Sequence, residues 1–232
     1  MKVKFGAIVT EGRGKIGGHV ASRNRAGSYF RTKVTPVNPQ TSFQSTSRNR
    51  LSGISSGWRG LTQAQRDAWN QAVGDFAKTD VFGDLKNPSG FNLYQRLNNN
   101  LANIGGTPLT SPPLVVPVDS FTSMSLAAED STVAESMTLT FAPAIASDHD
   151  VKVFATAPVS AGKNFVKSEY RQIAVISNGD TSPYDLLAEY QAKFGSTGSA
   201  GQKIFVKVVQ VENTSGLAGN ELSASAIVTV SS

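Results

Sequence analysis

The stretch that decides the fold runs from Gly12 to Gln44 and reads GRGKIGGHVASRNRAGSYFRTKVTPVNPQTSFQ. It lies in a quarter of the chain, residues 1–60, that holds 11 Lys and Arg against the single acid Glu11 and so carries a net charge of +10. The remaining 172 residues carry −5. Such asymmetry marks a segment that binds an acidic surface or nucleic acid. We therefore interpret residues 1–40 as a basic, glycine-rich arm that cannot close a core of its own.

Within this arm, residues 17–34 have the pattern of a β-hairpin. His19 to Ser22 and Tyr29 to Val34 flank a turn-like stretch, Arg25 to Ser28. A glycine-rich segment can also lie extended along a neighbouring subunit, so both readings keep the arm at a surface. Pro36 and Pro39 then stop regular structure, because proline has no backbone donor.

Residues 41–106 are expected to form a small helical unit. The stretch 41–58 predicts a polar helix that Gly53 and Gly57 weaken. Thr62 and Gln65 stand at capping-box spacing before a helix that contains Trp69 and Phe76. A third helix is indicated from Phe91 to Ile104 by apolar residues three and four positions apart, and the Gly-Gly pair at 105–106 ends it.

The periodicity changes after this unit. Residues 107–118, TPLTSPPLVVPV, predict a stiff proline-rich linker and a domain boundary. Alternating or β-rich runs follow at 137–141, 151–155, 172–176, 204–211 and 222–230, while 184–194 reads as a short helix or a crossing between strands. We expect an α+β multidomain protein: an extended N-terminal β-arm, a helical unit, and an antiparallel β-sandwich over 119–232.

Composition limits the other possibilities. The chain of 232 residues has no cysteine, which excludes disulfides and thiolate metal sites. The apolar run at the start is too short for a signal-peptide core, and no window approaches the roughly 18 apolar residues of a membrane span. We expect a protein that is made in the cytoplasm and exported, if at all, by lysis.

No enzyme chemistry is visible in the sequence. His19 and His149 are the two histidines, and neither stands at metal-ligand spacing from the other. Asp148, His149 and Asp150 are interpreted as a solvated loop between strands. The GxGK at 12–15 lacks the spacing of a phosphate-binding loop, and the serines have no evident base. We therefore predict no catalytic residue, no metal ligand and no cofactor site.

The C-terminal run from Gln202 to Val230, QKIFVKVVQVENTSGLAGNELSASAIVTV, resembles the last two strands of a fibronectin type III domain. A strand of alternating hydrophobics leads into an Asn…Gly loop and then into a serine-bearing final strand. Phe205 stands where such domains often have tyrosine. The resemblance implies an immunoglobulin-like sandwich, a fold that hosts many binding roles and names none.

Three motifs in the front half, taken in order, are similar to a pattern of uncharacterised tailed-phage virion proteins. They are GKIGGHVASRNRAGSYFRTKVTPVNPQTSFQ at 14–44, WRGLTQAQRDAW at 58–69 and GFNLY at 90–94. The resemblance covers residues 12–113. It implies a structural part of a particle, on the capsid or at the head–tail junction, and localisation in the virion.

Three functions remain open. In the first, the arm and helices join identical or neighbouring subunits, with the sandwich exposed. In the second, the arm binds DNA or RNA, with Tyr29 and Phe30 stacking on bases. In the third, the sandwich is an adhesin for host glycans. The candidate partner-binding residues are Arg13, Lys15, Arg23, Arg25, Tyr29, Phe30, Arg31 and Lys33. We favour the first function because the Pro-Val-Asn-Pro stretch at 36–39 leads directly into helices suited to hold a strand against protein.

Overall fold

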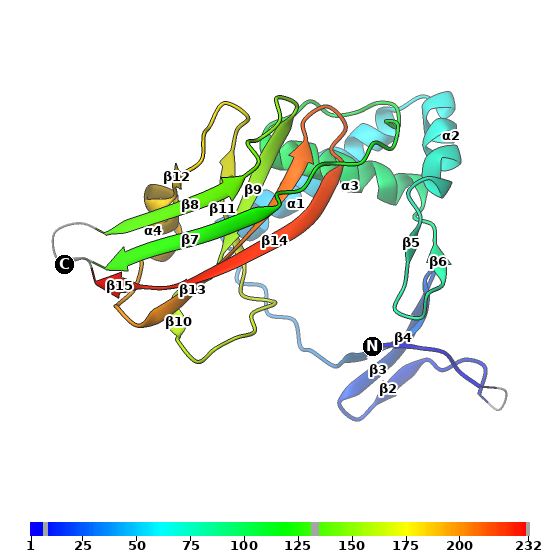
Figure 1. Cartoon of the computed structure of the whole chain (residues 1–232). Coiled ribbons are helices and arrows are strands. Elements are labelled where there is room, and N and C mark those ends of the chain that lie inside the picture. The colour runs from blue at the N-terminus through cyan, green and yellow to red at the C-terminus, as the bar shows by residue number, and fades with distance from the viewer. Residues whose placement is uncertain (7–8, 131–134, 231–232) are drawn as a thin grey trace. The chain divides into compact units, whose positions relative to one another are not determined.

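The structure is a computed structural model that describes residues 1–6, 9–130 and 135–230. It is a mixed α+β protein with four α-helices and several antiparallel sheets among the described residues (Figure 1). The chain divides into two compact units, Met1–Leu93 (unit 1) and Tyr94–Ser232 (unit 2).

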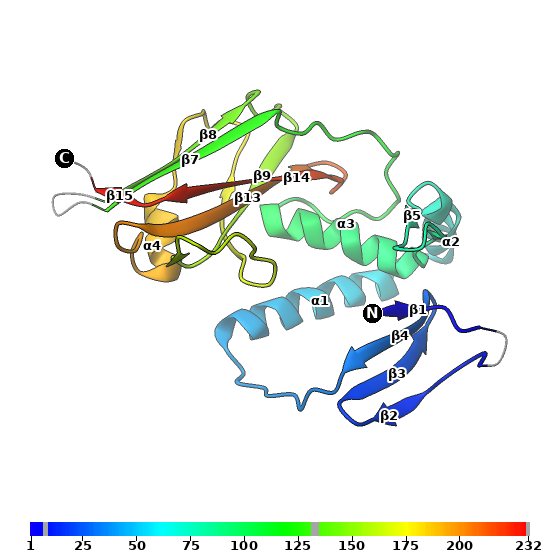
Figure 2. The same ribbon diagram turned by 60° about the horizontal axis from the view of Figure 1, so that its bottom comes forward.

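Unit 1 begins with a four-stranded antiparallel sheet in the order β1-β4-β3-β2, which Figure 2 shows side by side. Two helices, a short 3-10 helix and a two-stranded hairpin follow. The elements are β1 (Lys2–Val3), β2 (Gly14–Ile16), β3 (His19–Asn24), β4 (Gly27–Thr32), α1 (Ser42–Gly60), α2 (Gln63–Gln71), η1 (Ala72–Gly74), β5 (Lys78–Thr79) and β6 (Leu85–Lys86).

The expected hairpin is present, with the turn one residue earlier than the sequence indicated. Asn24 pairs with Gly27 across a two-residue loop, and the Ala26 amide donates to Asn24 Oδ1 at 2.9 Å. Gly27 has φ +105°, which L side chains rarely adopt. The interpretation of 1–40 as an extended arm is wrong, however. β1 pairs with β4, and Gly17, at φ +55°, turns β2 back onto β3, so the segment folds as a sheet of its own.

The helix starts follow the local chemistry of the sequence. Thr62 caps α2 by accepting from the Gln65 amide, and the Gln65 side chain accepts from the Thr62 amide, so the capping box is confirmed. Thr41 caps α1 with one such bond, because its side chain accepts from the Gln44 amide. The 19 residues of α1 form a continuous helix across Gly53 and Gly57, and none of them is buried. Trp58 near its end contacts the Phe91 ring at 5.6 Å between centroids.

Unit 2 contains two larger sheets. In the first sheet the strand order is β10-β13-β9-β11, and β14 also pairs with β13. In the second sheet the strand order is β12-β8-β7-β15. The elements are β7 (Ser123–Asp130), β8 (Ser136–Ala142), β9 (His149–Ala155), β10 (Val159–Ser160), β11 (Arg171–Ile176), β12 (Tyr184–Asp185), α4 (Leu187–Phe194), β13 (Gln202–Glu212), β14 (Ala218–Ile227) and β15 (Thr229–Val230). Helix α3 (Gly90–Ile104) crosses the boundary between the units.

Both large sheets and α4 contribute to one core. Met137 and Leu139 of β8, Val153 of β9 and Val206 of β13 are fully buried in the same hydrophobic cluster. Tyr190 of α4 is also buried there, and its hydroxyl donates to the Thr156 carbonyl at 2.9 Å. The strand residues recur at every second position, as expected for sheets with one buried face.

The division at Leu93 and Tyr94 lies earlier than the proline-rich segment 107–118, because the second half of α3 packs with unit 2. Lys152 of β9 donates to Asn100 Oδ1 at 2.9 Å, and the Asn100 side chain donates to the Gly216 carbonyl at 2.9 Å. Gly216 has φ +70°, and a Cβ there would stand 2.5 Å from the Leu97 carbonyl oxygen. Burial lowers the pKa of the Lys152 ammonium group. The helix end is therefore part of unit 2.

Candidate partner-binding site

The register of the N-terminal sheet separates the predicted site residues onto two faces. Cross-strand partners share a face, and successive residues of a strand alternate. Lys15 pairs with Val20, Val20 with Arg31, and Tyr29 with both Ser22 and Lys2. These six residues form one face, which we call the tyrosine face. On the opposite face, the phenylalanine face, Phe30 pairs with Ala21, and Arg23 with Ser28.

The phenylalanine face is covered by the chain that leads from β1 to β2. The Phe5 ring meets the Phe30 ring edge to face at 6.3 Å between centroids. Gly12 lies under Phe5, and a Cβ there would stand 3.3 Å from the ring. Ala21, on this face, is the one buried residue of the four strands. Phe30 is therefore engaged within unit 1 and is not free to stack on a base.

Two predicted cations are also engaged on this side. The Arg13 Nε donates to Glu11 Oε1 at 2.6 Å, and the Arg23 Nη1 to Glu11 Oε2 at 3.2 Å. The hydrogen bond from Arg13 is the largest cause that holds the pKa of the Glu11 carboxyl below its usual value, and Arg23 adds to it. Glu11 thus neutralises part of the charge that the sequence assigned to a partner.

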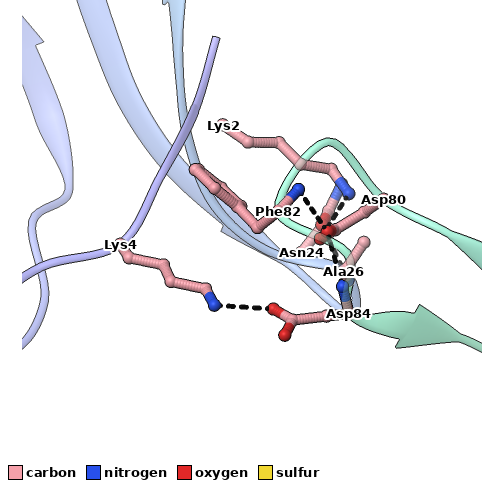
Figure 3. Close-up of polar contacts among 7 residues, drawn as sticks. All are labelled: Lys2, Lys4, Asn24, Ala26, Asp80, Phe82 and Asp84. Carbon is pink, nitrogen blue, oxygen red and sulfur yellow. Dashed lines mark hydrogen bonds and ion pairs between the residues drawn. The ribbon is translucent and has the colours of Figure 1, made fainter.

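One end of the sheet is clamped by the loop between β5 and β6 (Figure 3). Asp80 Oδ2 accepts from Lys2 Nζ at 3.1 Å, while its Oδ1 accepts from the Phe82 amide at 2.8 Å. Asp84 pairs with Lys4 at 2.9 Å. Burial raises the pKa of Asp80, but the Phe82 amide, Lys2 and the Asp84 amide outweigh it and lower the pKa below its usual value. The hollow between β1, the β3–β4 turn and this loop measures about 70 Å³, too small for an ordinary ligand pocket of roughly 300 Å³ or more.

The tyrosine face stays open away from this clamp. Lys15, Arg31 and Lys33 are exposed, and none of them makes an ion pair within residues 1–6, 9–130 and 135–230. Lys33 extends the ladder beyond β4, because its amide donates to the Gly18 carbonyl at 2.8 Å. Tyr29 is half-buried. Arg25 lies at the tip of the hairpin turn, exposed and without an ion pair in the described part of the chain.

The sequence predicted a partner-binding segment, and that remains a prediction, but it did not indicate the residues of the same unit that contact part of this segment. Glu11 and Phe5 contact members of the predicted set, namely Arg13, Arg23 and Phe30. Asp80 and Asp84 pair with Lys2 and Lys4, which were not predicted as site residues. Asp80 and Asp84 carried a local signal, because an Asp-x-x-Gly-Asp run favours a turn whose side chains cap their own amides. No local signal linked that turn to Lys2, 78 residues away.

The structure also places the histidine that the sequence set aside. His149 begins β9 and is buried, so the expected solvated loop around it is wrong. Its Nδ1 lies 2.6 Å from Asp148 Oδ1, and this contact is the main cause of a lowered pKa for the Asp148 carboxyl. In the described ranges, no group of three or more His, Cys, Asp or Glu side chains is arranged to hold a metal ion.

The chain has no match among protein-family models, among curated proteins or among solved structures. In the part of the chain that the structure describes, no helix has the length and apolar character to cross a membrane.

Proposed function

We propose that this chain is a non-enzymatic structural protein of a tailed-phage virion, in which unit 1 joins neighbouring subunits. The observation that carries the proposal is how little the N-terminal sheet and α1 of unit 1 bury. Four strands and the 19-residue α1 together bury a single hydrophobic residue, Ala21. Helices and sheets gain most of their stability from packing of an apolar face. Strands and a helix that bury so little within their own chain are therefore suited to packing against other chains. The phage assignment rests on the motif order at 14–94.

Exposed apolar side chains accompany this lack of burial. Phe43 and Leu51 of α1 are 67% and 51% exposed, and Val81 at the tip of the β5–β6 loop is 82% exposed. Exposed apolar residues that occur in several elements of one unit are more typical of a surface that contacts another chain than isolated ones are. These side chains give unit 1 apolar contact area in addition to the cations of the sheet. Protein interfaces combine an apolar core with a polar rim in this way.

Unit 2 is proposed to be a fibronectin type III-like sandwich that the particle exposes. Its strand order supports the proposal: β9, β11, β13 and β14 form one sheet, and β7, β8 and β12 the other, around a shared core. Phe205 is buried and has no hydroxyl that could make the tyrosine hydrogen bond of such domains. Tyr190 on α4 makes a buried hydrogen bond close by, because its hydroxyl donates to the Thr156 carbonyl while the Phe205 amide donates to the Thr156 hydroxyl.

The test is incorporation of tagged variants into purified virions. Deletion of residues 1–34 is expected to abolish incorporation while unit 2 stays folded. Tyr29→Ala is expected to lower incorporation directly, because Tyr29 lies on the open face. Phe30→Ala serves as the matched comparison, since Phe30 packs on Phe5 and its loss acts on the fold of the sheet. Incorporation of the deletion variant at the level of the intact chain would contradict the proposal.

Nucleic-acid binding is the second candidate. Lys15, Arg31 and Lys33 are exposed on or next to the tyrosine face, and none of them has an acidic partner among the described residues. If the sheet neutralises about six phosphates, binding should weaken by roughly 10³-fold or more between 50 and 200 mM salt. If the purified protein, free of particles, binds nucleic acid with this steep salt dependence, and Arg31→Glu abolishes the binding, nucleic-acid binding is favoured over subunit joining.

A further inference from the structure

The tyrosine face combines three properties of a protein-binding surface. It offers an aromatic side chain, Tyr29, whose hydroxyl makes no hydrogen bond within the described residues. Val20 lies half-buried between Lys15 and Arg31 in the same cross-strand row. An amphipathic aromatic beside an arginine is the composition enriched at the energetic centres of interfaces. No acidic residue occurs in the four strands.

The charge of unit 1 is not balanced within unit 1. It holds fourteen Lys and Arg against five Asp and Glu, a net charge of +9. Three of the five acids, Glu11, Asp80 and Asp84, already pair with other cations of the unit. The remaining two, Asp67 and Asp75, lie outside the sheet, at α2 and just after η1. The excess positive charge therefore favours an acidic partner for the tyrosine face.

Unit 2 has the complementary charge. It holds eight Lys and Arg against twelve Asp and Glu, a net charge of −4. Asp180, Asp185 and Glu189 gather around Tyr184, whose hydroxyl donates to Glu189 at 3.1 Å. None of the three carboxylates pairs with a Lys or Arg in the ranges described, and Asp180 and Asp185 are exposed. Every copy of the chain thus carries both a basic and an acidic surface.

We propose that the tyrosine face of one copy docks on the Asp180, Asp185 and Glu189 carboxylates of a second copy. This inference rests on the proposed function and names the neighbour that unit 1 binds. The contact is heterologous, because different surfaces of the two copies meet, so it repeats from copy to copy and builds a ring or a filament. Arg31 and Lys15 face the carboxylates, while Tyr29 and Val20 supply the apolar centre.

The geometry favours a protein over a nucleic acid as the occupant. Of the two aromatic rings that the sequence offered for base stacking, Phe30 packs on Phe5, so only the half-buried Tyr29 is left on the open face. Two of the predicted cations, Arg13 and Arg23, share the single carboxylate of Glu11, which offsets one of their two positive charges. The open face keeps Lys15, Arg31 and Lys33, a short patch with an apolar centre rather than a track of cations along a strand.

The test is sedimentation velocity of the intact chain and of four full-length variants over a range of concentration. Arg31→Glu is expected to raise the dissociation constant of self-association by about tenfold or more, equivalent to about 1.4 kcal/mol. Lys78→Glu is the matched control, because Lys78 is also an exposed strand cation of unit 1 without an ion pair in the described residues. It should leave association unchanged. Asp185→Lys is expected to weaken association as Arg31→Glu does.

Two combinations identify the contact. The double variant Arg31→Glu/Asp185→Lys should recover association in part, since the exchanged charges again oppose one another. A mixture of the two single variants should also associate, because Arg31 of one copy meets Asp185 of the other. No effect of Asp185→Lys, or equal effects of Arg31→Glu and Lys78→Glu, would overturn the proposal. So would salt-steep binding of a single-stranded oligonucleotide without self-association.

Failure here is distinguishable from failure of the proposed function. If the intact chain stays monomeric while deletion of residues 1–34 still blocks incorporation into virions, the second copy is excluded as the partner. Unit 1 then joins a different virion protein, and the proposed function stands. If the deletion variant is incorporated normally, the proposed function fails whatever the sedimentation shows.

Discussion

The two units differ most in how much of their apolar surface is buried. Among the described residues, 23 hydrophobic side chains of unit 2 are buried, against five of unit 1, namely Ala21, Leu61, Trp69, Phe76 and Leu93. Unit 2 is longer, but not by enough to explain this ratio. Its strands alternate toward one cluster, whereas the strands and α1 of unit 1 have no such cluster. Unit 2 therefore has one large hydrophobic core, whereas the N-terminal sheet and α1 of unit 1 leave most of their residues accessible.

The difference shows what holds each unit together. In unit 2 the dominant contribution is burial of apolar area, at about 25 cal/mol per Å². In the N-terminal sheet of unit 1, where Ala21 is the one buried residue of the four strands, ion pairs accompany that small burial: Asp80 pairs with Lys2, and Glu11 pairs with Arg23. Exposed ion pairs contribute little each, so we expect truncations in this unit to cost less stability than truncations in the core of unit 2.

The largest effect is expected from a core truncation in unit 2. Leu139→Ala removes a fully buried side chain from the hydrophobic cluster and should lower the free energy of unfolding by about 3 kcal/mol. Leu51→Ala in α1 is the matched variant, because Leu51 is 51% exposed, and it should change the free energy by less than about 0.5 kcal/mol. Urea titration followed by circular dichroism measures both. Equal losses would mean that α1 is buried in the free protein and that the comparison is wrong.

A smaller effect is expected at the α2 capping box of unit 1. Thr62→Ala removes the acceptor for the Gln65 amide and should cost about 1 kcal/mol of helix stability. Thr62→Ser keeps the hydroxyl and should cost much less. Amide hydrogen exchange at the start of α2 reports the change locally. Unchanged protection in Thr62→Ala would show that tertiary contacts, rather than the cap, hold this helix end.

The smallest effect at neutral pH concerns Tyr184 of unit 2. Burial, the Glu189 hydrogen bond and nearby carboxylates raise its pKa to about 12. Between about pH 10 and 12 the unfolded chain releases this proton while the folded chain keeps it, so stability falls as the pH rises. Tyr184→Phe should flatten the decline between about pH 10 and 12 and leave the urea midpoint at pH 7 nearly unchanged. A decline of the same slope in Tyr184→Phe would assign it to other tyrosines.

Local rules of the sequence predicted much of the fold. Thr62 and Gln65 determine where α2 starts, because a capping box needs four consecutive positions and nothing else. Alternation marked β8, β9, β11 and β13, and helical spacing marked α3. The run Ser123–Asp130, with apolar residues at 124, 126 and 128, carried the same alternation, yet β7 was not predicted. The strands of two residues could not be predicted from periodicity, because two residues are too few to show an alternation.

The candidate site divides in the same way. The sequence by itself determined that residues 13–33 are basic, that a hairpin forms there, and that Tyr29 and Phe30 lie on opposite faces, since strand residues alternate. Only the tertiary structure decided which face is covered. Phe5 on Phe30, Glu11 on Arg23 and Asp80 on Lys2 join residues from 12 to 78 positions apart, and such contacts depend on where the chain returns in space. Alternation and capping act over a few residues, whereas the choice of open face depends on these distant pairings.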